Sequence, residues 1–245
     1  MKQDDFRRLA EDVSQCHICE LLATLPHIQN SERLENDDHG LATGQPYVNR
    51  WNLWNGNLDA DIMVIGQDYG TKEEGDALEV CSYADTKNPT DVRLKKLFKS
   101  AFGIDIDSGE TPLFFTNMAN CYRMQRTSGG MHSAWLPICA NKFMARLIRI
   151  IQPKIIIVLG RVAFEALYCM EDLPVTCLDP AKKGKSDFAE IISHHYQIDL
   201  DGSKIGVFPV YHPGSNSQMN RNEAQQLEDW KKIAEYYDTK EKLHI

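Results

Sequence analysis

The chain has 245 residues, of which 42% are hydrophobic and 25% charged, a composition typical of a globular protein with one domain. No apolar run approaches the ~20 residues that span a bilayer, and the first residues lack the apolar core of a signal peptide, so we expect a cytoplasmic protein with no membrane partner. Because the net charge is -8, binding to DNA or RNA would require a local basic surface.

Helices and short apolar strands alternate along the chain. Helices are predicted where apolar residues recur every three or four positions, at 5–15, 91–102, 136–151, 161–170 and 221–243. Strands are predicted where short runs are rich in Ile, Val and Phe, at 62–65, 111–118, 153–160 and 204–213. Asp201-Gly202, between two alternating segments, indicates a hairpin that leads into the last strand. The pattern predicts an α/β fold with a central, mostly parallel sheet of about four strands flanked by helices.

Polar residues follow the predicted strands at the point where each strand ends. Residues 62–65 are apolar on both faces, as in the interior of a parallel sheet, and Asp68 follows them closely. Asn117 ends another strand, and His212 follows a third, where Pro213 stops further pairing. Because ligands bind at the carboxyl ends of parallel strands, we expect Asp68, Asn117 and His212 to form a catalytic site.

The seven cysteines are unevenly spaced, which favours free thiols or metal ligands over a disulfide framework. Cys16 and Cys19 form a C-x2-C pair, Cys121 follows a predicted strand, and Cys139 lies near the start of a predicted helix. Four such thiolates suit tetrahedral zinc or a 4Fe–4S cluster, and the spacing does not choose between them. The other three are expected to be small buried apolar residues: Cys81, Cys169 and Cys177.

Five motifs in this order resemble the iron–sulfur branch of the uracil-DNA glycosylase superfamily. They are the early C-x2-C pair, Gly66-Gln67-Asp68-Tyr69-Gly70, Thr116-Asn117 with Cys121, Cys139 before PKIIIVLG, and His212-Pro213-Gly214-Ser215. The branch has Glu-Ala-Pro in its first motif and usually serine after His-Pro, so this chain departs from it at both places. Its Gly-Gln-Asp-Tyr is more similar to the Gly-Gln-Asp-Pro-Tyr of the cluster-free uracil glycosylases, whose aspartate serves the attacking water.

The resemblance implies one three-layer domain over residues 1–245, with a cysteine-bearing helix at its N-terminus and a helix at its C-terminus. It implies a monomeric enzyme that removes uracil or a related deaminated base from single- or double-stranded DNA. Each residue then has an implied role, in catalysis (Asp68, His212), base recognition (Asn117, Gln67, Tyr69), DNA-backbone binding (Gly214, Ser215, Arg221) or 4Fe–4S ligation (Cys16, Cys19, Cys121, Cys139).

Two other functions fit some of these features. A non-catalytic nucleic-acid or nucleotide binding protein with a four-cysteine metal site would explain the cysteines and the acidic charge. A small-molecule hydrolase could use the same edge of the sheet.

If the protein binds DNA despite its net charge of -8, the DNA-binding face would draw on the available basic residues: Arg93, Lys95, Lys96, Arg123, Arg126 and Arg221.

Overall fold

The computed structural model describes residues 2–14, 16, 18, 57–68, 89–106, 108, 111–119, 136–179, 187–214 and 219–243. Its strands are β1 (Ile62–Gly66), β2 (Leu113–Asn117), β3 (Ile155–Leu159), β4 (Val175–Cys177), β5 (Tyr196–Leu200) and β6 (Ser203–Val210). Its helices are α1 (Lys2–Ser14), α5 (Pro89–Phe102), α6 (Leu136–Cys139), α7 (Ala145–Ile151), α8 (Arg161–Tyr168), α9 (Phe188–Ile191) and α10 (Glu223–Leu243), with a π-helical segment η2 (Ala140–Met144) between α6 and α7.

The strands form a single sheet in the order β2-β1-β3-β6-β5-β4. The first four are parallel to one another, as predicted, whereas β5 and β4 are added antiparallel. The α/β class is therefore confirmed, but the predicted number of four strands is wrong, because the described part of the chain has six. β4 has only three residues, too few for a recognisable pattern.

The predicted hairpin is confirmed. β5 and β6 pair directly, and Asp201 (φ 52°) and Gly202 (φ 91°) form the turn between them. Positive φ at both central residues is the backbone of a type I′ turn, which matches the twist of paired strands.

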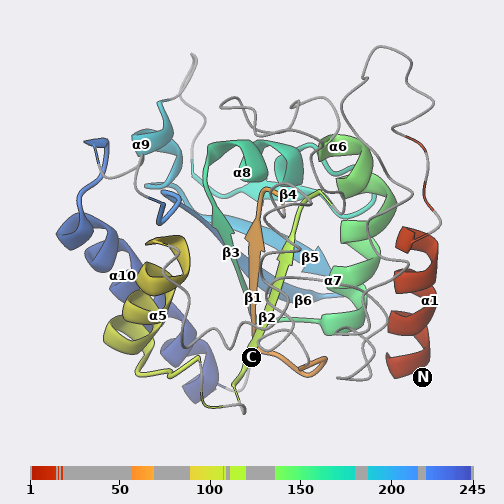
Figure 1. Ribbon diagram of the computed structural model, residues 1–245, viewed down its shortest axis with the longest axis horizontal. Coiled ribbons are helices and arrows are strands. Elements are labelled where there is room, and N and C mark those ends of the chain that lie inside the picture. The colour runs from red at the N-terminus through yellow and green to blue at the C-terminus, as the bar shows by residue number, and fades with distance from the viewer. Residues whose placement is uncertain are drawn as a thin grey trace.

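Helices cover the two faces of the sheet (Figure 1). On one face, α1, α7 and α8 enclose a cluster that contains Phe6, Phe114 and Phe164. On the other, α5 and α10 enclose a second cluster, in which the fully buried Trp230 packs edge-on against Phe98. The expected three layers are thus present. None of the helices in the described ranges has the length and apolar character required to cross a bilayer.

Candidate active site

The carboxyl ends of β1 and β2 lie side by side. Gly66 pairs with Asn117, and beyond the strands the N–H groups of Met118 and Ala119 donate to the carbonyls of Gly66 (2.8 Å) and Gln67 (2.9 Å). The two chains therefore stay together as they leave the sheet. The first motif emerges directly beside Asn117.

The side chain of Asn117 is buried, and among the described residues its amide nitrogen has no hydrogen-bond partner. Only 1% of the residue is exposed, and Nδ2 has no acceptor within the described part of the chain. Asn117 is two residues beyond Phe115, so it shares the face of the sheet that α5 covers. A buried donor left unpaired costs about 1–3 kcal/mol. A ligand that accepts from Nδ2 would recover this cost.

Asp68 lies just beyond β1 and is half-buried. Gln67 donates from Nε2 to Asp68 Oδ2 at 2.9 Å. This bond restrains the carboxylate at the carboxyl edge of the sheet, two residues beyond the Gly66–Asn117 pair.

The imidazole of His212 is held by its own loop. β6 ends at Val210, opposite Leu159 of β3, and two residues later the N–H of Gly214 donates to His212 Nδ1 at 2.9 Å. Because Nδ1 accepts this bond, the hydrogen of the neutral ring lies on Nε2. The ring is thereby prepared as a donor through Nε2.

Steric crowding explains why position 214 is glycine. A Cβ there would lie 2.8 Å from His212 Nδ1 and 3.4 Å from Thr90 Oγ1. A serine in this backbone conformation would push against the imidazole, so the departure from the family motif accompanies the close approach of the loop to the ring.

β3 separates the Asp68 and His212 segments. Neighbouring strands are about 4.8 Å apart, so the chains leaving β1 and β6 begin roughly 10 Å from each other. β3 is followed by Gly160, which has φ 92° and adds no side chain between them. With this spacing, Asp68 and His212 could act on the two opposite sides of one bond in a substrate that lies between them.

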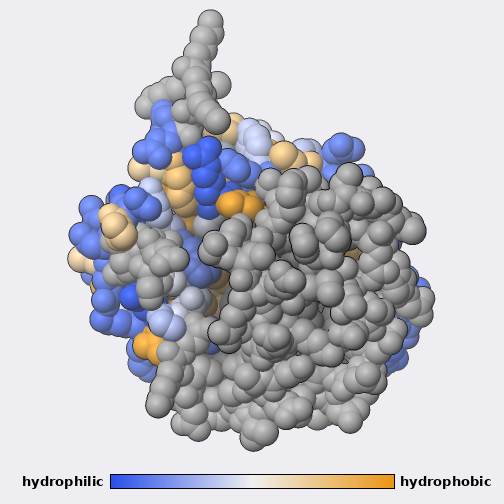
Figure 2. All heavy atoms as spheres, turned by 45° about the horizontal axis from the view of Figure 1, so that its top comes forward, coloured by the Kyte–Doolittle hydropathy of each residue, from blue (hydrophilic) through white to orange (hydrophobic). Residues whose placement is uncertain are grey.

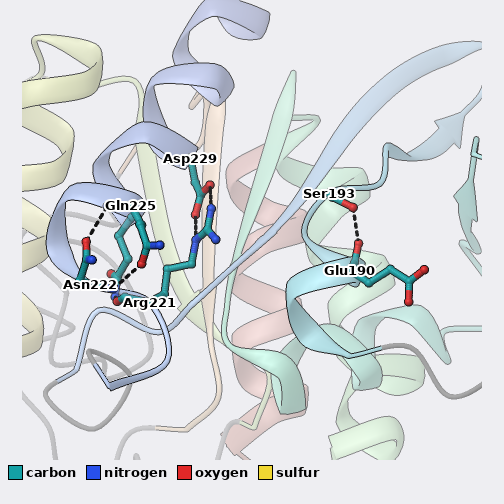
Figure 3. A network of polar contacts seen from close by, with 7 residues as sticks. Glu190, Ser193, Arg221, Asn222, Gln225 and Asp229 are labelled. Carbon is teal, nitrogen blue, oxygen red and sulfur yellow. Dashed lines mark hydrogen bonds and ion pairs between the residues drawn. The ribbon is translucent and has the colours of Figure 1, made fainter.

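Arg221 is fixed by an ion pair. Its Nε and one terminal nitrogen donate to the two carboxylate oxygens of Asp229, at 2.7 and 2.5 Å (Figure 3). These bonds raise the pKa of Arg221 above its ordinary value. The same figure shows Asn222 and Gln225 bonded reciprocally at the start of α10. Arg221 is therefore rigidly placed, but Asp229 offsets much of its charge. The pairing with Asp229 was not foreseen from the sequence.

The other basic residues of the expected DNA-binding face differ in their surroundings. Lys96 pairs with Glu223 of α10, and Arg93 donates to the carbonyl of Pro213 at 2.7 Å. Arg123 and Arg126 lie outside the described residues, as do Tyr69 and Ser215. In the coloured part of the view in Figure 2, hydrophobic residues lie among hydrophilic ones.

Two of the four expected metal ligands are described, and both are buried. Cys16 (8% exposed) follows α1 and Cys139 (5% exposed) ends α6, and they belong to the same hydrophobic cluster. Lys142, in the π-helical turn after Cys139, donates from Nζ to Cys16 Sγ at 3.5 Å. Two buried sulfurs from distant segments, with an ammonium beside one of them, are compatible with a thiolate-bound metal.

The structure does not describe the other two expected ligands, because Cys19 and Cys121 lie outside the described residues. Within the described ranges, no three His, Cys, Asp or Glu side chains are grouped to hold a metal ion. Among the remaining cysteines, Cys81 is likewise outside these ranges and Cys177 is half-buried. The expectation that Cys169 is buried is wrong, because it is exposed at the C-terminal end of α8.

Comparison with known proteins agrees with this geometry. The family model described as "Uracil DNA glycosylase superfamily" matches residues 53–235, which include Asp68, Asn117 and His212. The match begins after Cys16 and Cys19. Comparison with curated proteins finds no significant match. The family match extends over well more than half of the chain, and the chain belongs to the uracil-DNA glycosylase superfamily.

Proposed function

We propose that this protein hydrolyses the N-glycosidic bond of uracil or a related deaminated base in DNA, the first step of base excision repair. Membership of the superfamily indicates DNA glycosylase chemistry in general. The observation that carries the more specific proposal is the buried amide of Asn117, which has no acceptor among the described residues and whose strand position pairs with Gly66, two residues before Asp68. It offers a base a preformed hydrogen-bonding edge at the place where a carboxylate is available.

Asp68 serves the sugar side of the reaction. Cleavage of the glycosidic bond builds positive charge on the sugar and negative charge on the departing base, so the site requires an anion near the former. The carboxylate, restrained by Gln67, orients or deprotonates the attacking water and offsets the sugar cation.

His212 serves the departing base. With Nδ1 accepting from Gly214, the neutral imidazole donates from Nε2 to a carbonyl oxygen of the base and stabilises its developing negative charge. A preorganised donor of this kind requires no rearrangement of the loop during the reaction.

Asn117 reads the base after the nucleotide is flipped out of the stack. Its amide nitrogen donates to a carbonyl of uracil and its oxygen accepts from the ring N–H. Cytosine presents the reversed pattern and would leave the buried donor unpaired. Gln67 and Tyr69 complete the recognition, while Gly214, Ser215 and Arg221 contact the flanking phosphates.

The cofactor proposed is a 4Fe–4S cluster held by Cys16, Cys19, Cys121 and Cys139, with zinc as the alternative. The burial of Cys16 and Cys139 and the ammonium of Lys142 support a thiolate site. Its role is structural, because glycosidic hydrolysis requires no electron transfer. It would fasten the chain just after α1, at Cys16, to the end of α6, at Cys139.

The test uses single- and double-stranded oligonucleotides that contain one uracil, incubated with the protein and then heated in alkali. Strand breaks at the uracil are expected. They should be absent from matched thymine oligonucleotides and should form much more slowly with the His212→Ala variant. Oligonucleotides with hypoxanthine or xanthine extend the test to other deaminated bases. Retained binding without cleavage of any of these substrates would favour the non-catalytic binding protein.

A further inference from the structure

The first turn of α5 contacts the loop that carries His212. Arg93 donates from a terminal nitrogen to the carbonyl of Pro213 at 2.7 Å, across 120 positions of sequence. Thr90, in the same turn, has its hydroxyl 3.4 Å from the position that a Cβ of Gly214 would occupy. The helix therefore meets the loop at residues 213 and 214, directly after His212.

The two hydrogen bonds at this contact belong to one peptide group. The carbonyl of Pro213 and the N–H of Gly214 are the two ends of the same planar unit, which cannot tilt at one end alone. Arg93 binds the carbonyl end, and the N–H end donates to His212 Nδ1. A charged donor on the carbonyl also polarises the peptide and strengthens its N–H as a donor.

We propose that Arg93 is a positioning residue, which fixes the Pro213–Gly214 peptide and through it the tautomer and orientation of His212. The inference rests on the proposed function, because it assigns Arg93 a role towards the catalytic imidazole. It differs from the expectation that Arg93 binds DNA phosphate. The geometry assigns its short, charge-assisted hydrogen bond to the loop instead.

The first measurement requires no substrate. NMR of the imidazole nitrogens in histidine-labelled, full-length protein should show His212 Nδ1 as an unprotonated acceptor in the wild type. Arg93→Met should broaden or shift these signals towards a mixture of tautomers, whereas Arg93→Lys should largely restore them. Lys99→Met is the matched control, because Lys99 lies on the same helix and pairs with Asp105.

The second measurement separates positioning from phosphate binding. At saturating uracil-containing DNA, Arg93→Met should lower the single-turnover rate roughly 10- to 100-fold, the size expected for a misplaced catalytic group. Its DNA affinity and salt dependence should match those of Lys99→Met. Unchanged His212 signals, together with weaker binding and a salt slope lower by about 1, would instead identify Arg93 as a phosphate ligand and overturn the proposal.

Stability and activity controls keep the outcomes distinct. If Arg93→Met is unfolded by its melting curve, Arg93→Gln replaces it, because glutamine keeps a donor without the charge. If the wild type is inactive but Arg93→Met still changes the His212 signals, the result would count against the proposed function and not against the positioning role. Unaltered His212 signals in every folded Arg93 variant would count against the positioning role alone.

Discussion

The carboxyl edge of the sheet and the layer formed by α1, α6 and α7 handle polar groups in opposite ways. At the edge, Asn117 keeps a buried donor that has no acceptor among the described residues, and the loop of His212 donates to its Nδ1. In the helical layer, polar groups are paired: Asp12 forms an ion pair with Arg146 at 2.7 Å, and Lys142 donates a hydrogen bond to the sulfur of Cys16.

We interpret the carboxyl edge of the sheet as the region that serves function and the layer of α1, α6 and α7 as the region that serves stability. An unpaired buried donor is destabilising, and the proposed base would supply the acceptor that Asn117 Nδ2 lacks among the described residues. The pairs Asp12–Arg146 and Lys142–Cys16 instead join the helix near the N-terminus to the segment of 139–151, beside the buried cysteines. Substitutions at the edge should therefore change the reaction more than the stability of the fold, and substitutions in the layer should do the reverse.

The largest effect is expected in the helical layer. Pure protein should contain iron and sulfide, and Cys139→Ala should lose both and melt at a lower temperature, because thiolate sites contribute directly to folding. Elemental analysis and melting curves provide the measurements. Cys169→Ala is the control, since this exposed cysteine should not affect iron content. Stoichiometric zinc without iron after anaerobic purification would contradict the cluster.

At the edge, His212→Ala should have the largest effect on rate. Loss of the donor to the departing base should lower the single-turnover rate by ~10²–10³-fold, as loss of an oxyanion donor does in other enzymes. The melting temperature should change little, because His212 lies in a loop beyond β6. A rate close to that of the wild type would show that the imidazole does not act on the base.

Asp68→Asn keeps the shape of the side chain but removes its charge. The single-turnover rate should fall by ~10²-fold, the size typical for a lost general base, while DNA binding persists. Filter binding and a single-turnover assay on the same uracil substrate measure the two quantities. Equal losses of binding and rate would place Asp68 in substrate binding instead.

Asn117→Asp should mainly change which base is removed. The substitution takes away a donor from the reading edge, and such a contact is worth about 1–3 kcal/mol of discrimination between bases. Rates on uracil and cytosine in the same sequence context provide the ratio to compare with the wild type. A proportional fall on both bases would mean that Asn117 does not select between them.

The smallest effect is expected for Arg221→Met. Binding should weaken with a salt slope reduced by at most about 1, because Asp229 already neutralises part of the guanidinium. Arg149→Met is the control, since Arg149 bonds the carbonyl of Asp172 on the opposite helical layer. A fall in slope no greater than that of the control would exclude a phosphate contact by Arg221.

The sequence by itself determined the α/β class, the parallel strands, the hairpin at Asp201-Gly202 and the placement of Asp68, Asn117 and His212 at strand ends. These features follow from local periodicity and turn residues, which operate over a few positions of the chain. β4 escaped prediction because three residues carry no period, and its pairing with β5 depends on a distant segment.

Only the tertiary structure decided how these side chains are prepared for chemistry. The acceptor state of His212 Nδ1 depends on a backbone N–H two residues away, and that peptide is held by Arg93 from a helix 120 positions earlier. The Asn117 amide, which has no acceptor among the described residues, and the ion pair of Arg221 with Asp229 likewise depend on which groups meet in space. Residue type specifies what a side chain can donate or accept, whereas packing decides which partner it has.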